Sequence, residues 1–223
     1  MAKNVPSTET WRLNEVAVGP IIRAAHLGRK KTFKKGEFLY RQGAVDTEFF
    51  FILRGRIQIF TGREDGTEFV LEVMGQWAIC GEGAAFDGQP RFSSAVAQED
   101  TEVIVFDANE VGKAFQLAPD FALALLKITS MKQRVLGIRA QYLASANPES
   151  RISELLRRLA ELYGRPQDGG VLIDIALTHD QIAAMTGTSR VTITRVLKKL
   201  RETNAIQTRG KQIWILDVSR LHL

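Results

Sequence analysis

Two arginines near the C-terminal end of the chain have the spacing of base-reading side chains. Arg190 and Arg195 fall in a predicted helix, where five residues correspond to ~7.5 Å along the axis and about 140° around it. Two long side chains at that separation reach into one major groove of duplex DNA. The planar guanidinium group matches the O6 and N7 acceptors of guanine, and each such contact contributes about 1–3 kcal/mol of discrimination between bases.

The sequence around these arginines predicts two short helices joined by a tight turn. Thr178 and Ser189 are residue types that cap helix N-termini, and Gly187 permits the turn between the helices. In a helix-turn-helix the first turns of the second helix contact base edges, while the preceding helix crosses the DNA backbone. We therefore expect DNA contacts from Thr178, Ser189, Arg190, Val191, Thr192, Thr194, Arg195, Lys198, Lys199, Arg209 and Lys211.

Basic side chains are concentrated in the same region. The whole chain has a formal net charge of +5, and residues 187–211 hold seven basic side chains against one acidic side chain. Such a surface suits phosphate groups, although a solvated helix face would have the same composition. The segment 207–215 then predicts a two-stranded wing with Gly210 at its tip. Together these features favour a DNA-binding module.

The composition fits a folded protein without an obvious catalytic centre. The chain has 223 residues, of which 45% are hydrophobic and 25% charged, enough for one large domain or two small ones. It shows neither an N-terminal signal peptide nor a run of about 18 uncharged apolar residues, so we expect a cytoplasmic protein and no membrane partner. Cys80 is the single cysteine, and we expect it to be a buried packing residue. The three histidines are scattered and none falls within 32–107, so we expect no metal site, no metal-dependent enzyme of the cupin type and no catalytic activity.

Short apolar or alternating runs separated by glycine-containing turns occupy residues 32–107. Turn residues recur about every 8–12 residues, which is typical of an antiparallel β-sandwich or barrel. The runs cover residues 38–40, 49–53, 57–60, 69–73 and 103–106. We expect the domain that contains them, together with the N-terminal segment, to span residues 1–115.

A long helix is predicted next, within residues 116–146. Its apolar positions recur at intervals of three and four, as in the seam of a coiled coil. The pattern predicts a homodimer, unless the helix simply packs on its own barrel. The interface would contain Ile128, Met131, Val135, Ile138 and Tyr142. Asn147 and Pro148 interrupt the helix and begin a third segment, 147–223, which holds the helix-turn-helix.

The order of barrel, long helix and winged helix-turn-helix resembles the family of the cyclic-AMP receptor protein and the fumarate-nitrate regulator, the CRP/FNR family of bacterial transcription regulators. The most specific matching segments are 33–37, 81–91 and 187–195. The resemblance implies an α+β fold: an N-terminal antiparallel β-roll (a double-stranded jelly-roll barrel), a long dimerisation helix and a C-terminal winged helix-turn-helix. It further implies a homodimer that binds a palindromic operator in double-stranded DNA, responds to a small-molecule effector and contacts RNA polymerase.

One position in the second helix of the motif departs from the cyclic-AMP receptor protein. Val191 stands where that protein has glutamate, and the segment 190–195 looks more like the nitrogen-control branch of the family. Valine cannot accept a hydrogen bond from cytosine N4, but it can touch the methyl group of thymine. We therefore expect a half-site with a guanine read by arginine and an altered preference beside it.

The resemblance also implies an effector pocket between the barrel and the long helix. Its residues would be Gly81, Glu82, Gly83, Ala84, Arg91, Phe92, Ser93, Lys132, Leu136 and Gly137. In a cyclic-nucleotide site of this kind, Glu82 would accept a hydrogen bond from a ribose hydroxyl and Arg91 would neutralise the phosphate. Phe92 and the pair Leu136 and Gly137 depart from the pattern of nucleotide-binding members.

Three alternatives for the control of this protein follow from these residues, two with an effector and one without. The first is cyclic AMP or another cyclic nucleotide. The second is 2-oxoglutarate or a similar carboxylate, held by Arg91 and Lys132 as the likeness to the nitrogen-control branch suggests. The third is a constitutive DNA-binding regulator of the same fold without an effector, in which Glu82 and Arg91 form an internal ion pair.

Overall fold

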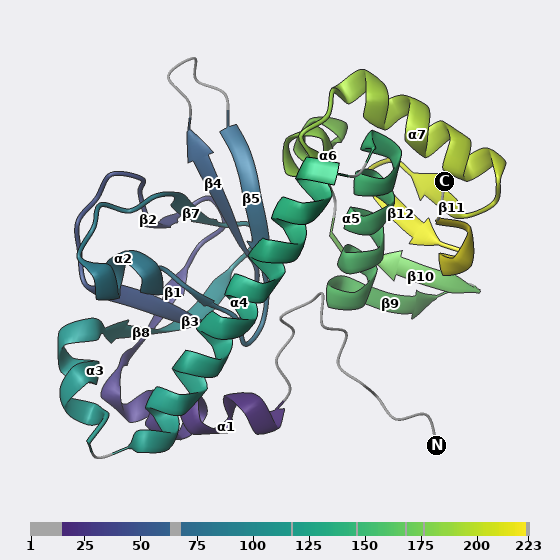
Figure 1. Ribbon diagram of the computed structural model, residues 1–223. Coiled ribbons are helices and arrows are strands. Elements are labelled where there is room, and N and C mark those ends of the chain that lie inside the picture. Colours follow the sequence, from purple (N-terminus) through teal and green to yellow (C-terminus); the bar gives the residue numbers. More distant parts are fainter. Residues whose placement is uncertain are drawn as a thin grey trace. The chain divides into compact units, whose positions relative to one another are not determined.

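The computed structural model describes residues 15–62, 68–116, 118–145, 147–167, 169–175 and 177–221 (Figure 1). The chain divides into two compact units, one of residues 12–132 and one that contains residues 133–223. The boundary between the units falls inside helix α4 (Pro119–Ser145). No helix among the described residues is long and apolar enough to cross a membrane.

Two four-stranded antiparallel sheets form the first unit. The strand orders are β1-β8-β3-β6 and β2-β7-β4-β5. The strands are β1 (Arg29–Phe33), β2 (Phe38–Tyr40), β3 (Glu48–Arg54), β4 (Ile57–Gly62), β5 (Glu68–Met74), β6 (Ile79–Cys80), β7 (Ser94–Ala97) and β8 (Thr101–Asp107). The predicted antiparallel roll is confirmed. The predicted runs omit β1, β6 and β7. β1 opens with three basic residues, β6 has only two residues, and β7 consists mostly of small residues (Ser94, Ala95 and Ala97).

Helices cover one face of the first sheet. α1 (Glu15–Arg23), a 3₁₀ turn (Ala24–Leu27), α3 (Ala108–Ala114) and the first half of α4 pack against β3 and β8. The side chains of Phe49 and Phe51 point into this core, while the whole run from Phe49 to Ile52 is buried. A strand covered on both faces needs apolar residues at every position, which explains the continuous run in the sequence.

The first two residues of the apolar seam predicted for the homodimer are covered by the protein's own roll. Ile128 is 2% exposed and lies in the core of the first unit, and Met131 packs against the same core. The two residues therefore face their own roll, which corrects the expectation that they face a second chain. Val135 is also buried, and the side chains of Ile138 and Tyr142 lie outside the described residues. A heptad pattern shows that a stripe must be covered, but the pattern does not show which surface covers it.

The second unit is a winged helix-turn-helix. It contains α5 (Pro148–Tyr163), β9 (Gly164–Gln167), β10 (Gly170–Ile173), α6 (His179–Thr186), α7 (Arg190–Glu202), β11 (Ile206–Arg209), β12 (Gln212–Ile215) and a 3₁₀ turn (Val218–Leu221). The sheet order is β11-β12-β10-β9, with all pairings antiparallel. The three helices bury one continuous apolar core against this sheet. The fold class expected from the sequence is confirmed.

Strand β9 lacks a strand signal in the sequence, because it contains glycine and proline. Gly164 permits it, since a Cβ at this position would lie 2.1 Å from the Ala160 carbonyl oxygen and 2.5 Å from Val171. The chain can therefore turn directly from the end of α5 into an edge strand beside β10.

Candidate nucleic-acid interface and effector pocket

Side-chain caps determine where the two helices of the DNA-binding motif begin. Thr178 Oγ1 accepts a hydrogen bond from Gln181 N at 3.1 Å, and Gln181 Oε1 accepts one from Thr178 N at 2.8 Å. Gly187, with a φ of 59°, ends α6 in the left-handed region. Ser189 Oγ then accepts a hydrogen bond from Thr192 N at 3.1 Å at the start of α7. Each cap satisfies backbone N–H groups that have no partner within the helix.

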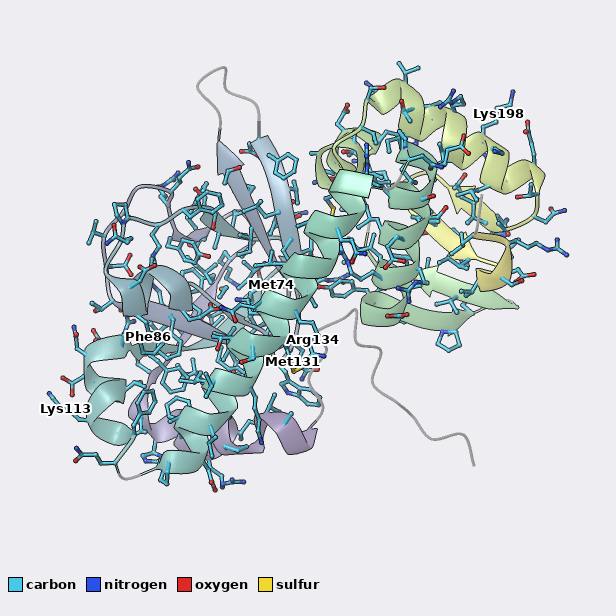
Figure 2. All side chains as sticks on the ribbon, viewed as in Figure 1. Met74, Phe86, Lys113, Met131, Arg134 and Lys198 are labelled. Atoms are coloured by element: carbon cyan, nitrogen blue, oxygen red, sulfur yellow. The ribbon has the colours of Figure 1, made fainter. Side chains whose placement is uncertain are left out.

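Helix α7 has one buried face and one exposed face. The buried residues, none more than 1% exposed, are Ile193, Val196, Leu197 and Leu200. On the other face Val191 is 79% exposed, the Arg190 side chain is 70% exposed, and Thr194 and Arg195 are exposed as well. Figure 2 shows Lys198 projecting outward from the same helix. The exposed face of α7 thus carries the side chains expected to meet base edges, and their contact with DNA stays a prediction.

Helix α6 contacts two of these side chains through residues that the sequence analysis did not select. Asp180 Oδ2 lies 3.8 Å from Arg190 Nη1, and His179 Nδ1 lies 3.0 Å from Thr194 Oγ1. Both α6 residues occupy the first turn of the helix, directly after the cap at Thr178. Their position beside the cap is the signal that could have identified them. The first turn of α6 therefore helps to orient the exposed face of α7.

The lysines of α7 differ in their surroundings. Lys198 Nζ lies 3.8 Å from Glu202 Oε1, and both side chains are more than 60% exposed. Lys199 Nζ lies 3.0 Å from Glu149 Oε2 in the first turn of α5, so a phosphate contact by Lys199 competes with this ion pair. Lys198 is therefore the better placed of the two for a phosphate.

The wing has the predicted form. β11 and β12 pair antiparallel with Arg209 opposite Gln212, and Gly210 between them has a φ of 60°. The Arg209 guanidinium lies 5.4 Å from the centre of the Trp214 ring, which supports the arginine on the wing. Lys211 is exposed at the tip. The wing thus holds two cations at the surface of the second unit.

The predicted effector residues of the first unit gather at one corner, between β6 and helix α2 (Glu82–Asp87). Gly81 has a φ of 83°, and a Cβ there would lie 2.6 Å from Arg91 Nη1, so the corner requires glycine. Glu82 is 8% exposed and forms an ion pair with Lys132, whose Nζ also donates to the Ile79 carbonyl at 3.1 Å. Lys132 therefore joins α4 to this corner.

Arg91 is buried beside the same corner with partners of its own. Its guanidinium pairs with Asp46, donates to the carbonyl oxygens of Gly81 and Glu48, and lies 4.4 Å from the centre of the Tyr40 ring. Glu82 and Arg91 thus do not pair with each other. This corrects the ion pair that was expected for the regulator without an effector. Each of them belongs to a separate internal ion pair.

The remaining effector candidates are divided between exposed and buried positions. Ser93 is 9% exposed, whereas Phe92 is 75% exposed. Gly83 and Ala84 lie on α2. Leu136 and Gly137 belong to the second unit, where both are exposed, and a Cβ at Gly137 would meet no atom within 4 Å. Their part in effector binding stays a prediction.

Cys80 lies inside the roll as the sequence predicts, at 1% exposure. Burial raises the pKa of the Cys80 thiol to about 12, and the Glu82 carboxylate adds to the shift. Burial likewise raises the pKa of the neighbouring Tyr40 hydroxyl. The thiol is therefore protonated at neutral pH. Within the described residues no group of three or more His, Cys, Asp and Glu side chains could hold a metal ion.

Comparisons with known proteins match both units. The cyclic nucleotide-binding domain matches residues 30–117, and the Crp-like helix-turn-helix domain matches residues 150–223. A CRP-like cAMP-activated global transcriptional regulator of Mycobacterium tuberculosis is 26% identical over 85% of this chain and 84% of its own length. A global nitrogen regulator of Synechocystis sp. is 29% identical over 83% of each chain. The structure of a CooA mutant from Carboxydothermus hydrogenoformans shares the fold, with a TM-score of 0.77 at 20% identity over 95% of this chain and 96% of that one.

The roll, the long helix and the winged motif define an effector-responsive, DNA-binding transcription regulator. The chain belongs to the CRP/FNR family.

Proposed function

We propose that this regulator binds a palindromic operator as a homodimer, with one α7 helix in each of two successive major grooves. The observation that carries the proposal is the two-faced character of α7. Its apolar face completes the core of the second unit, while Arg190, Val191 and Arg195 stay exposed on the other face. Arg190 and Arg195 read guanines, and Lys198 and the wing cations contact phosphates. RNA polymerase is the expected protein partner, and the proposal includes no catalytic reaction.

We place the interface of the proposed homodimer on a second stripe of α4. Leu126 and Leu136 are 62% and 59% exposed, although both are large apolar residues. They belong to a stripe with alternating steps of three and four residues, whose members are Ala122, Leu126, Thr129, Gln133, Leu136 and Ala140. A heptad stripe that is not covered by its own roll is suited to pairing with the same stripe of a second chain.

The proposed effector is a small anion that acts at the Gly81 corner. A cyclic nucleotide is supported by the matching cyclic nucleotide-binding domain and by a relative named as cAMP-activated. A carboxylate such as 2-oxoglutarate is the second candidate, since Lys132 supplies a cation beside the corner. For the carboxylate to bind there, Lys132 must leave Glu82.

Fluorescence anisotropy with a labelled palindromic duplex tests the proposed function. We expect binding to the palindrome with a Kd at least tenfold lower than to a scrambled duplex of the same length. Cyclic AMP and 2-oxoglutarate are then added in separate titrations, and the effector is the compound that changes the Kd. Equal affinity for palindromic and scrambled duplexes would refute the DNA-recognition role assigned to α7.

A constitutive regulator is the second candidate function, because Arg91 already has an anionic partner within the chain. In that case the same titrations leave the Kd for the operator unchanged.

A further inference from the structure

The chain itself uses almost all of the hydrogen-bonding capacity of Arg91. A guanidinium group has five N–H donors. Arg91 Nε donates to Asp46 Oδ2 at 3.2 Å, and Nη2 donates to Asp46 Oδ1 and to the Glu48 carbonyl oxygen. Nη1 donates to the Gly81 carbonyl oxygen at 2.5 Å. Four of the five donors are therefore engaged, and one on Nη1 remains for a ligand.

Solvent reaches Asp46 but not the guanidinium group. The Arg91 side chain is 1% exposed, whereas the Asp46 side chain is 37% exposed. Asp46 Oδ1 also accepts a hydrogen bond from Glu48 N at 3.0 Å, which holds the carboxylate in place over the arginine. An anion that approaches from solvent therefore meets a negative carboxylate before it meets Arg91.

The energetics favour this internal pair over a weakly bound anion. Two parallel N–H···O bonds between a guanidinium and a carboxylate are among the strongest polar contacts in proteins. A phosphodiester that took the place of Asp46 on Arg91 would leave the carboxylate without its partner and close to another negative charge. The ligand has to compensate for both effects before any net affinity appears.

We propose that Asp46 is an internal anion that occupies the anion-binding side of Arg91 and thereby determines which effectors the roll accepts. This inference rests on the proposed function and refines it. Only one N–H of Arg91 remains free, so an effector whose phosphate takes two hydrogen bonds from Arg91 binds only by displacing Asp46. The carboxylate therefore lowers the affinity of the roll for cyclic nucleotides.

The displacement would act on the corner that Lys132 also holds. Arg91 donates to the Gly81 carbonyl oxygen, and the next residue, Glu82, pairs with Lys132 of α4. A ligand that changes the partner of Arg91 therefore acts one residue away from the contact between the roll and α4. Asp46 thus sets the ligand concentration at which the corner responds.

Isothermal titration calorimetry with cyclic AMP on the full-length protein tests the proposal. Asp46→Asn keeps the shape of the side chain and removes its charge. We expect this variant to bind cyclic AMP at least tenfold more tightly than the wild-type protein. Glu48→Gln is the matched control, because its side chain pairs with Arg29 and only its main chain contacts Arg91. We expect the control to bind as the wild-type protein does.

A second variant and a second measurement keep the test decisive. Asp46→Asn combined with Arg91→Lys should lose the gain in affinity. If Asp46→Asn does not fold, the ¹⁵N resonance of Arg91 Nε in the wild-type protein is followed during the titration. A shift at saturating cyclic AMP supports displacement of Asp46, and an unchanged resonance in a protein that binds cyclic AMP overturns the proposal.

Two further outcomes overturn the inference. One is an affinity of Asp46→Asn within twofold of wild type, and the other is an equal gain in Glu48→Gln, which would indicate a general charge effect. Operator binding by the same proteins is measured in parallel. If operator binding is intact, either of these outcomes refutes the role of Asp46 and leaves the proposed function unaffected. If operator binding is absent in every protein, wild type included, the proposed function is refuted.

Discussion

Arg190 and Lys198 lie on one helix with different expected roles. Arg190→Ala removes a guanidinium from the N-terminal turn of α7, so base preference should relax at one position of each half-site by about 1–3 kcal/mol. Lys198→Ala should instead weaken binding to all sequences alike and reduce the slope of log K against log salt by about 1. Competition anisotropy with single-base operator variants, at several salt concentrations, measures both effects. A uniform loss in both variants would show that the roles are assigned wrongly.

Cys80 should be unreactive in the folded protein. Burial raises the pKa of its thiol to about 12, whereas a thiol in the unfolded chain has a pKa of about 8.5. The contribution of Cys80 to the free energy of unfolding should therefore be complete below about pH 8.5 and be lost as the pH rises toward 12, because in that window the thiol ionises only in the unfolded chain. Alkylation by iodoacetamide at pH 8 should be at least a hundredfold slower in buffer than in concentrated urea. Equal rates would contradict the buried position of this thiol.

Helix α4 carries two apolar stripes with different surroundings. One stripe, which includes Ile128, is covered by the protein's own roll, and the stripe with Leu126 and Leu136 is exposed. A charge on the exposed stripe should disrupt only the pairing of two chains. A charge at Ile128 would disturb the core of the first unit as well.

Leu126→Asp should therefore convert the protein to a monomer while its circular dichroism stays unchanged. Burying two opposed carboxylates in a helix pair is strongly unfavourable. Sedimentation velocity measures the oligomeric state. Lys127→Asp is the control, because Lys127 is exposed and lies about 140° around the helix axis from Ala122 of the stripe. Dissociation by the control alone would assign the interface to a different face of α4.

At the scale of the whole molecule, dimer geometry should determine the operator. Two recognition helices in successive major grooves lie about 34 Å apart, which corresponds to one turn of the DNA. Inserting five base pairs between the half-sites rotates one of them by about half a turn, so only one α7 can dock. Anisotropy should then give the affinity of an isolated half-site. Unchanged affinity after the insertion would exclude a rigid two-fold dimer on the operator.

The sequence by itself determined the features of this protein that depend on residues close together along the chain. The caps at Thr178 and Ser189 and the turn at Gly187 act within a few residues, so the positions of α6 and α7 could be predicted. The aromatic run of β3 likewise indicated a buried strand. Candidate residues such as Arg190 and Arg195 followed from their spacing on one helix.

Only the tertiary structure decided which distant residues meet. Asp46 lies 45 residues before Arg91 in the sequence, and Lys132 lies 50 residues after Glu82. Both pairs depend on how the strands of the roll and α4 pack. The covered stripe of α4 was decided in the same way, because any sufficiently apolar surface can bury a heptad pattern. Charge pairing and packing are short-range in space and not in sequence, so spacing alone identifies the side chains but not their partners.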